Sequence, residues 1–496
     1  MLTEILIFVI TTLVGYCLWI YKKVHNCFDE RGVKYLPGIP LFGNAFLTTF
    51  RIRHFQDDLD YVYRKFPEER YVGFIESTRP IILIRDPDLI KMITVKDFNH
   101  FTNHTNFVNE EMDPLFDETL IMMKGQRWHD MRTTLSPAFT GSKIKMMMPF
   151  MVETSKNILE HLNGCKNEEI DVGDLICRFT SDVIASAAFG LEVNSVKNKD
   201  NEFFRKGQAV FDFTLMQHIN IFFLTQFPKV AKIFRYFNKS SSKVTEFFRD
   251  IVVKTIDYRE KNKVVRPDMI NLLIEASKGL LSNNPNEKDA GVGYATVAED
   301  TKDDNAPKKT IEWTLDEIVG QVFNFFVAGF ETTASSITIC IHELALNPEI
   351  QERLYHELKE FSETETLSYN NVDKLKYLDC VLNETFRKWS AAIVLDRVCT
   401  KEYVLPPPHD GGKPYRVNVG DLIYNSVNSI HMDPKYWPEP SMFNPERFSE
   451  ENKRNIKPFT FMPFGSGPRA CIGSRFALIE FKVLLYHLLT NFKIVK

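Results

Sequence analysis

The chain has 496 residues, of which 44% are hydrophobic and 25% charged, the composition of a globular protein large enough to bury a substantial core. Its 61 basic and 65 acidic residues give a formal net charge of −4, so no overall basic field favours binding to nucleic acid. The eight cysteines form no CxxC pair and no zinc-ligand spacing with histidine, which argues against a disulfide framework and fits a reducing compartment.

The N-terminus departs from this globular pattern. Residues 5–21, ILIFVITTLVGYCLWIY, are a charge-free run just long enough to cross a thin bilayer as a helix. Lys22 and Lys23 follow, and by the positive-inside tendency they stay cytosolic. A cleaved signal peptide is the alternative, but no basic region precedes the run and no A-x-A-like site follows it. We predict a retained transmembrane signal-anchor over residues 1–21.

Residues 22–45 are predicted to be a basic, proline-rich hinge, because YLPGIPLFG (35–43) contains prolines and glycines that prevent a helix from continuing. Beyond it, residues 70–74 and 81–85 indicate a short hairpin, Asp86 opens a helix, and helical spacing continues to about Ser390. The polar stretch 282–309 is predicted to be a mobile surface loop. With no repeat or linker within the body, we expect a single large domain over residues 46–496, mainly α with a small β portion.

The first motif of chemical interest in the helical body is WHDMR. Trp128 and Arg132 stand four residues apart, so they share one helix face and could together hold a flat, anionic ligand. The alternative is an ordinary half-exposed amphipathic helix.

A very long helix is predicted next. Thr314 and Glu317 form a capping-box pattern, and the helical spacing ends at Asn347, which gives about 33 residues and roughly 50 Å. In its middle, AGFETT (328–333) places Glu331 and Thr332 in an otherwise apolar stretch. The motif is either a satisfied polar patch in a core helix or a local opening that holds water and passes protons.

ETFR places Glu384 and Arg387 three residues apart on a helix over about residues 372–388. Such a pair is often an exposed salt bridge that contributes only about a few tenths of a kcal/mol. PERF, at residues 445–448, adds Arg447 as a candidate second cation for a buried Glu384.

The segment FMPFGSGPRACIG (461–473) combines glycines, an arginine and a cysteine. Gly465, Gly467 and Gly473 permit the backbone to lie close to a bulky planar group. Cys471 lies just before a predicted helix, whose unpaired N–H groups and dipole favour a thiolate, and Arg469 adds a nearby cation. A structural cysteine needs none of this arrangement, so a functional role is favoured.

These motifs together resemble the cytochrome P450 family of haem-thiolate monooxygenases. FGSGPRACIG matches the family's haem-ligand signature FxxGxRxCxG at every specified position: Phe464, Gly467, Arg469, Cys471 and Gly473. In the family's order along the chain, WHDMR looks like its WxxxR helix, AGFETT its oxygen-activation motif, ETFR its ExxR motif, and PERF the segment that completes a Glu-Arg-Arg lock. The agreement covers nearly the whole chain and implies the cytochrome P450 fold.

The resemblance also implies a cofactor, haem b (iron protoporphyrin IX), with Cys471 as the axial thiolate ligand of the iron, whose electron donation favours O–O cleavage. The residues implied to bind the haem propionates are Trp128, Arg132, Arg397 and Arg469. Glu331 and Thr332 would deliver protons during oxygen activation. The implied structural lock, which holds the cysteine loop against the core, consists of Glu384, Arg387 and Arg447.

No GxGxxG follows a predicted strand and no flavin segment is visible, so the chain resembles the microsomal type. That type receives electrons from NADPH–cytochrome P450 reductase, with NADPH acting only indirectly and cytochrome b5 as a further candidate partner. The implied location is the endoplasmic reticulum membrane, with the catalytic domain on the cytosolic face.

Within the family, RPDMINLLIEA (266–276), FFVAGFETTAS (325–335) and RVCTKEY (397–403) resemble insect microsomal enzymes that oxidise foreign compounds and pesticides. A small apolar substrate is therefore expected: a xenobiotic, an insecticide or a lipophilic plant compound. The candidate pocket residues are Phe101, Phe107, Phe325, Phe326, Ala328, Phe330 and Ile393, although aromatic residues are also ordinary core. Residues 219–239, which are aromatic and basic, are expected either to dip into the bilayer interface or to lie under a neighbouring helix.

Two features depart from the family pattern. Ser390, Ala391 and Ala392 replace the usual proline-rich loop, which removes rigidity from a loop that should face the pocket. The sequence also ends 25 residues after Cys471, where relatives continue into strands that contact substrate, so it is either incomplete or impaired there. The alternatives are an endogenous fatty-acid or hormone hydroxylase, a haem-thiolate isomerase or dehydratase, and a catalytically silent haem-binding membrane protein. The intact Glu331-Thr332 pair argues against the isomerase.

Overall fold

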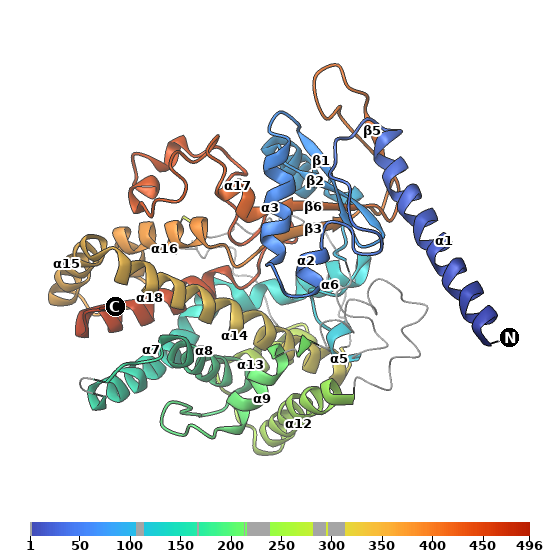
Figure 1. Ribbon diagram of the computed structural model, residues 1–496. Helices are drawn as coiled ribbons and strands as arrows, with labels where there is room; N and C mark the ends of the chain where they lie inside the picture. The colour runs from blue at the N-terminus through green and yellow to red at the C-terminus, as the bar shows by residue number, and fades with distance from the viewer. Residues whose placement is uncertain are drawn as a thin grey trace.

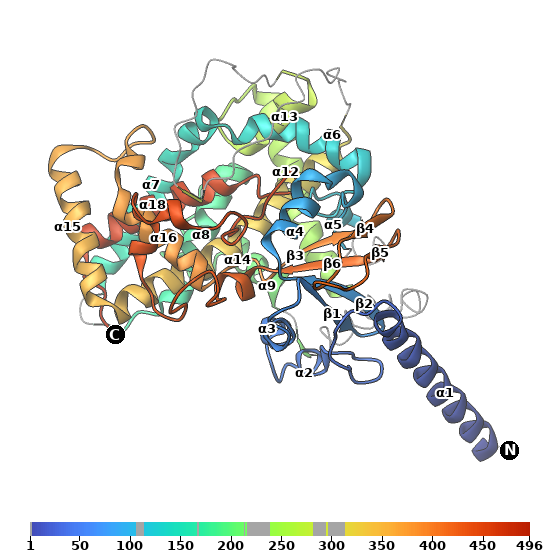
Figure 2. The ribbon, with the colours of Figure 1, turned by 90° about the horizontal axis from the view of Figure 1, so that it is seen from above.

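The computed structural model describes residues 2–105, 114–165, 168–212, 214–215, 239–280, 294–295 and 313–496 (Figures 1 and 2). The helices are α1 (Leu2–Asp29), α2 (Phe46–Thr49), α3 (Phe55–Lys65), α4 (Pro87–Lys91), α5 (Pro114–Asp117), α6 (Gly125–Leu135), α7 (Gly141–Gly164), α8 (Val172–Phe189), α9 (Glu202–Phe211), α12 (Lys239–Asn262), α13 (Met269–Ser277), α14 (Leu315–Leu346), α15 (Pro348–Thr364), α16 (Lys376–Lys388), α17 (Val427–His431) and α18 (Ser474–Asn491). The strands are β1 (Tyr71–Glu76), β2 (Arg79–Ile84), β3 (Val394–Val398), β4 (Tyr403–Leu405), β5 (Tyr415–Val417) and β6 (Leu422–Ser426). The predicted mainly α fold with a small β portion is confirmed.

Helix α14 crosses the helical part of the molecule (Figures 1 and 2). Its predicted capping box is confirmed: the Glu317 N–H donates to Thr314 Oγ1 at 3.2 Å, and the Thr314 N–H donates to the Glu317 carboxylate at 2.9 Å. The helix has 32 residues, close to the predicted length. It packs most extensively against α8, and Gly329 faces that neighbour, because a Cβ there would lie 2.7 Å from Ile184 Cδ1.

The four-stranded sheet joins the two ends of the chain, with strand order β1-β2-β6-β3. β1 and β2 form the predicted hairpin, in which Tyr71 pairs with Ile84 and Phe74 with Ile81. β2 runs parallel to β6, which in turn pairs antiparallel with β3, so Arg397 is placed by the sheet. β4 and β5 form a separate two-stranded sheet.

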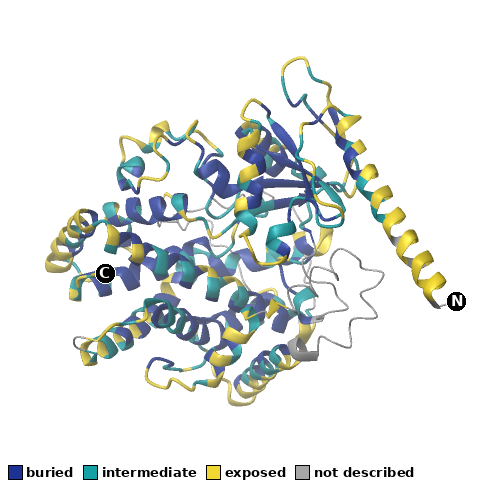
Figure 3. Ribbon diagram, viewed as in Figure 1, coloured by how far each residue is buried: buried dark blue, intermediate teal, exposed yellow. Residues whose placement is uncertain are grey.

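The hydrophobic interior has two main parts. The larger lies among the helices and includes the buried sides of α7, α8, α14, α16 and α18, which Figure 3 shows in dark blue. The smaller covers the four-stranded sheet and includes Val24 and Phe28 from the end of α1. The loop that carries Cys471 leads into α18, at the larger core.

Helix α1 projects from the domain, and most of its residues are exposed (Figure 3). It is the one helix in the described part of the chain that is long and apolar enough to cross a membrane, with a mean hydropathy of 1.9. Within the segment predicted as a hinge, Tyr35 pairs with Gly73 and Gly43 pairs with Glu76 in isolated β-bridges. Phe107, most of the predicted loop 282–309 and nearly all of segment 219–239 lie outside the described residues.

Candidate active site

The loop that carries Cys471 is fastened to the segment after β2. The Cys471 N–H donates to the Phe464 carbonyl at 2.8 Å, which closes a turn. Gly467 has φ +71°, and a Cβ there would lie 1.9 Å from the carbonyl oxygen of Thr94. Ser466 Oγ donates to Thr94 Oγ1 at 2.9 Å. The glycine at position 467 is therefore required by both the backbone conformation and the close approach of Thr94.

Cys471 is accessible to solvent, although many protein atoms lie around its thiol. Burial raises the pKa of the Cys471 thiol, and the Gly473 N–H and the positive charge of Arg132 oppose that shift without cancelling it. The sequence predicted that the helix N-terminus would favour the thiolate. In the protein without a ligand, however, the effect of desolvation on the thiol pKa is larger than the opposing effects of the Gly473 N–H and Arg132. A bound metal cation deprotonates a coordinating thiol outright, so we expect the Cys471 thiolate to form when the thiol ligates a metal.

The middle of α14 presents two exposed residues within an otherwise buried region. Ala328 and Thr332 are exposed, whereas Phe326, Phe330 and Thr333 around them are buried. Ala328 and Thr332 stand one helical turn apart, so they share a face. From these exposed positions on a core helix, and from the exposed Cys471, we infer an internal cavity between α14 and the cysteine loop.

Glu331 and Thr332 lie on different sides of α14. The Thr332 hydroxyl donates to the Ala328 carbonyl at 2.5 Å. The Glu331 carboxylate accepts a hydrogen bond from Ser335 Oγ at 3.3 Å, and its charge adds to the burial that raises the pKa of Cys177 on α8 to about 11. Because consecutive helical residues are rotated by about 100°, the Thr332 and Glu331 side chains point in different directions, and Thr332 shares the exposed side with Ala328.

Three arginines gather beside the cysteine loop. The Arg469 guanidinium lies 3.9 Å from the centre of the Trp128 ring and donates to the carbonyls of Thr102 at 3.0 Å and Met123 at 2.8 Å. Burial, with the charges of Arg397 and Arg132, lowers the pKa of Arg469 to about 9. Burial also lowers the pKa of Arg397 to about 10. The three arginines among the predicted propionate-binding residues are therefore close enough for Arg469 to be repelled by the other two.

This cluster fits an anionic ligand. Arg397 is 2% exposed, and its Nε has no hydrogen-bond partner within the described residues. The carboxylate of the adjacent residue, Asp396, already accepts hydrogen bonds from His104 Nδ1 at 2.8 Å and from the Thr105 N–H at 2.5 Å. A buried guanidinium with an unused donor is costly, and carboxylate ligands such as two propionates would satisfy it. The residues present thus fit haem, with Cys471 available as the iron ligand.

His104 and Asp396 were not predicted from the sequence. Burial lowers the pKa of His104, so its imidazole is neutral near pH 7 and can donate or accept. His104 Nδ1 also lies 3.5 Å from Arg397 Nη1. Asp396 could have been predicted to lie at the site, because it is next to the predicted cation Arg397 in the sequence. Nothing in the sequence around His104 indicates that it lies there.

The predicted Glu-Arg-Arg group is brought together on α16 and the short helix at Pro445–Phe448. The Glu384 carboxylate is fully buried and lies 2.7 Å from Arg387 Nε, 2.8 Å from Arg387 Nη2 and 3.4 Å from Arg447 Nε. Arg387 also donates to the carbonyls of His431 and Pro440. This network ties α16 to α17 and to the chain before the cysteine loop.

The predicted pocket aromatics divide into two groups. Phe326 and Phe330 lie on the side of α14 opposite Ala328, and Phe326 packs on Phe248 with ring centres 4.6 Å apart. We therefore assign these two residues to the core, together with Phe101, which is also fully buried. Phe325 and Ile393 are partly buried. The centre of the Phe325 ring lies 5.1 Å from that of Phe139. In the loop at residues 390–392, where the sequence departs from the family pattern, Ser390 Oγ donates a hydrogen bond to the Ala392 carbonyl at 3.0 Å.

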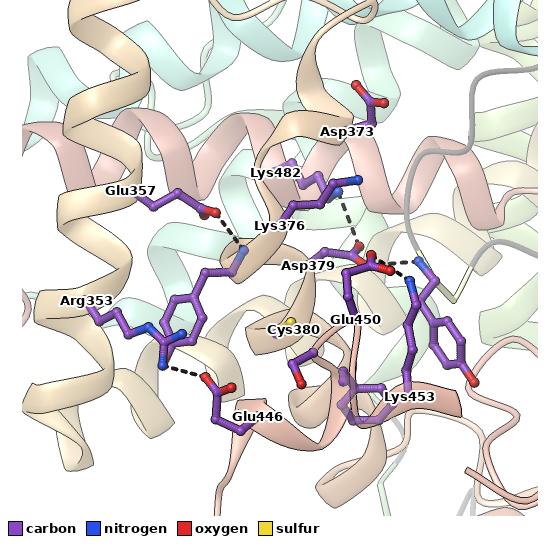
Figure 4. A pocket seen from close by; sticks show the side chains of 14 residues that line it. Arg353, Glu357, Asp373, Lys376, Asp379, Cys380, Glu446, Glu450, Lys453 and Lys482 are labelled. Atoms are coloured by element: carbon purple, nitrogen blue, oxygen red, sulfur yellow. Dashed lines mark hydrogen bonds and ion pairs between the residues drawn. The ribbon is translucent and has the colours of Figure 1, made fainter. Parts of the chain in front are cut away.

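A cavity of about 460 Å³ lies between α15, α16 and residues 446–453 (Figure 4). None of the predicted site residues lines it. Most of its charged side chains form ion pairs: Lys453 with Glu450 at 2.7 Å, Lys482 with Asp379 at 3.3 Å, and Arg353 with Glu446. Glu357, which burial gives a raised pKa, accepts the Tyr377 and Leu378 N–H groups at the start of α16. These contacts are structural, so the Cys471 cavity remains the candidate active site.

Comparison with known proteins leads to the same site. The family model described as cytochrome P450 matches residues 33–496. Cytochrome P450 9e2 of Blattella germanica is 40% identical over 492 residues, which cover 95% of this chain and 88% of the relative. The probable cytochrome P450 9f2 of Drosophila melanogaster is also 40% identical, over 95% of this chain and 89% of the relative. Cytochrome P450 6k1 of Blattella germanica is 34% identical over 99% of this chain and 91% of the relative.

Similarity of this extent identifies more than a shared fold, because it spans every motif that contributes to the site. The relatives are insect proteins, as the sequence resemblance predicted. Haem as the cofactor, and monooxygenation as the reaction class, follow from the family. The chain belongs to the cytochrome P450 family.

Proposed function

We propose that this monooxygenase is a membrane-anchored enzyme that inserts one atom of O2 into small lipophilic foreign compounds, such as insecticides or plant products. Its electrons come from NADPH through cytochrome P450 reductase, with cytochrome b5 as an additional donor. The catalytic domain lies on the cytosolic face of the endoplasmic reticulum.

The observation that carries this proposal is the pair of exposed residues on α14. The exposed Ala328 and Thr332 would border the inferred cavity beside Cys471, and Ala328 is small and apolar. Partly buried Phe325 precedes Ala328 by one helical turn and adds an aromatic surface. A cavity with such walls favours apolar ligands, because burial of apolar surface is the main source of their affinity.

Different residues of the chain have different roles in this proposal. Haem, when bound, supplies the redox chemistry of oxygen activation. Cys471 would be its axial ligand, while Arg132, Arg397 and Arg469 would hold its propionates. The Thr332 hydroxyl, which donates to the Ala328 carbonyl in the structure, would turn from it to pass a proton into the cavity, and Glu331, on a neighbouring face of α14, would resupply that proton.

The membrane assignment rests on α1. Large apolar side chains such as Ile7 and Phe8 are exposed along it, and Lys22 and Lys23 follow the apolar run. An exposed apolar helix of this length is stable in a bilayer and unfavourable in water. The lysines favour a cytosolic position for the chain that follows.

The proposal is tested first by the absorption spectrum of the reduced, carbon-monoxide-bound protein. We expect the red-shifted Soret band of a thiolate-ligated haem in the wild type and its loss in Cys471→Ala. Cys399→Ala is a matched control, since Cys399 is buried in the sheet core and lies outside the site. An unshifted wild-type band would contradict the assignment of Cys471.

The second test separates the alternatives by electron source. Vesicles that contain the enzyme, the reductase and NADPH should convert lipophilic xenobiotics, and omission of the reductase should abolish conversion. Turnover of a hydroperoxide without NADPH would favour the isomerase or dehydratase. Preferential conversion of fatty acids or hormones would favour an endogenous hydroxylase. No product in any arm, with an intact spectrum, would favour a silent haem-binding protein.

A further inference from the structure

The connection between α16 and β3, residues 389–393, is flanked on both sides by contacts with the cysteine loop. At the end of α16, the centre of the Phe386 ring lies 5.4 Å from that of Phe464. At the start of β3, Leu395 approaches Gly465 so closely that a Cβ there would lie 3.6 Å from Leu395 Cδ2. The connection therefore runs beside the segment that holds the candidate iron ligand.

The sequence of this connection does not make it rigid by itself. Residues 390–392 are Ser-Ala-Ala, without a proline to fix φ and with side chains too small to pack extensively. Ser390 Oγ donates to the Ala392 carbonyl, within the connection. The Ile393 carbonyl accepts the Val427 N–H at 3.2 Å, which holds the end next to β3. The end next to α16 needs an attachment of its own.

Trp389, the first residue of the connection, supplies that attachment through its indole N–H. Trp389 Nε1 donates to Glu343 Oε1 at 2.7 Å. Glu343 is 1% exposed and lies on α14, about three helical turns after Thr332. A hydrogen bond to a buried carboxylate is stronger than one between neutral groups. The connection is thus fixed to the helix that forms the opposite wall of the inferred cavity.

The contribution of this hydrogen bond differs from that of the neighbouring cation. Lys388 Nζ lies 2.8 Å from the same carboxylate oxygen, so the buried Glu343 already has a counter-charge. Trp389 is 44% exposed, so burial of its ring does not by itself determine its place. What the indole N–H adds is a fixed direction for the chain as it leaves α16.

The residues that follow keep part of their surface free. Ala392, Ile393, Val394 and Leu395 are four consecutive apolar residues, and all four are partly buried. Such a run, attached to α14 at one end and packed on the cysteine loop at the other, fits the wall of a cavity that takes lipophilic ligands.

We propose that Trp389 is a positioning residue for substrate: its hydrogen bond to Glu343 sets the place of residues 390–393 and, through them, the shape of the inferred cavity. The inference rests on the proposed function in one respect, that lipophilic ligands enter this cavity. A ligand that must order a loose wall loses affinity, because the ordering costs conformational entropy. Loss of the indole N–H should therefore weaken ligands that reach the wall and spare smaller ones.

The test uses two ligands of haem iron, imidazole and 4-phenylimidazole, with the full-length, haem-loaded chain. Binding of both is followed by the shift of the Soret band, which requires neither the reductase nor a known substrate. Imidazole reports on the haem site alone, whereas the phenyl group of the larger ligand extends into the cavity. Trp389→Phe removes the N–H and keeps an aromatic ring. Lys388→Met, which removes the other donor to the same carboxylate oxygen, is the matched control.

We expect Trp389→Phe to raise the Kd of phenylimidazole about fivefold or more, the loss of one hydrogen bond, and to leave that of imidazole within about twofold. Lys388→Met should change neither Kd, although its midpoint of urea unfolding should fall. An unchanged ratio of the two Kd values in Trp389→Phe, or an equal change in both variants, would overturn the role of Trp389. So would the loss of the thiolate Soret band in Trp389→Phe, because it would indicate a structural role. A wild type that gives no shift with imidazole would instead contradict the proposed haem site.

Hydrogen–deuterium exchange measures the position of the connection independently of any ligand. The amides of residues 390–393 should exchange several-fold faster in Trp389→Phe than in the wild type, while those of α16 keep their protection. Unchanged exchange at 390–393 would show that the hydrogen bond does not hold the connection. Faster exchange throughout α16 would show general loosening of the helix, and either result would overturn the proposal.

Discussion

Replacement of Glu384 by glutamine tests the energetic importance of the buried network most directly. The carboxylate receives three close donors: Arg387 Nε at 2.7 Å, Arg387 Nη2 at 2.8 Å and the Asn444 N–H at 2.9 Å, with Arg447 Nε at 3.4 Å. Glu384→Gln keeps the shape but replaces one acceptor oxygen with an NH2 donor that must face an arginine. It also leaves the fully buried Arg387 without its counter-charge.

Breaking a buried pair from one side costs about 3–5 kcal/mol, because an uncompensated charge remains in the interior. The two carbonyls that also accept from Arg387 place the expected loss at the lower end of this range. Since a whole domain is stable by only about 5–15 kcal/mol, this loss is large. It should appear as a lower midpoint of urea unfolding, followed by circular dichroism, and as reduced haem incorporation.

The matched control is Glu402→Gln, the same exchange in a surface pair. Glu402 lies 2.6 Å from Arg416, but both side chains are more than half exposed. Exposed pairs contribute about 0–1 kcal/mol, so this variant should unfold near the wild-type midpoint. Equal losses in Glu384→Gln and Glu402→Gln would refute the argument that burial makes the Glu384 network important.

Three further changes address the loop, a buried acid and the cavity. Gly467→Ala should sharply lower haem incorporation, measured by the carbon-monoxide spectrum, because the new Cβ would overlap the Thr94 carbonyl. Burial raises the pKa of Glu480 well above its usual value of 4.5. Above pH 4.5 Glu480 is therefore ionised in the unfolded state but still protonated in the folded state, so it lowers the free energy of unfolding of the wild type by about 1.4 kcal/mol per pH unit. Glu480→Gln should lack this decline when urea midpoints are compared at pH 5 and pH 8. Ala328→Phe should raise the spectral Kd of bulky apolar substrates at least tenfold without a loss of stability, because it fills the cavity.

Each change has a control of the same chemical kind. Gly411→Ala also places a side chain at positive φ (+80°) but meets nothing within 4 Å, so it should retain haem. Ala334→Phe, at a buried position on α14, should destabilise the fold where Ala328→Phe does not. A constant difference between Glu480→Gln and wild type from pH 5 to pH 8 would contradict the raised pKa of Glu480.

The local features of the fold were the most predictable from the sequence. The capping residue Thr314 and the continuous apolar run at residues 81–84 act through neighbours in the chain, so their patterns can be recognised directly in the sequence. The direction of side chains on α14 was harder. Phe326 precedes the oxygen motif and Phe330 lies within it, yet helical rotation turns both into the core and leaves Ala328 on the exposed side.

Interactions between distant segments could not be predicted. The sequence explains Gly467 by the approach of a planar group, but the structure adds the carbonyl of Thr94, more than 370 residues earlier. His104 likewise meets Asp396 across 292 positions. Such contacts are set by the topology of the sheet and loops, for which a single sequence offers no periodic or local signal.

The charges around the cysteine loop explain why cofactor and fold depend on each other. Burial disfavours charge on Arg397 and Arg469, and Asp396 shares its oxygens with His104 and Thr105. A dianionic ligand at this place lowers the free energy of the folded state alone, since the unfolded chain does not bring these arginines together. Under the proposed binding mode haem would stabilise the arrangement of residues that binds it, and loss of either Arg397 or the Thr94–Gly467 contact should weaken both haem binding and the stability of the haem-loaded protein.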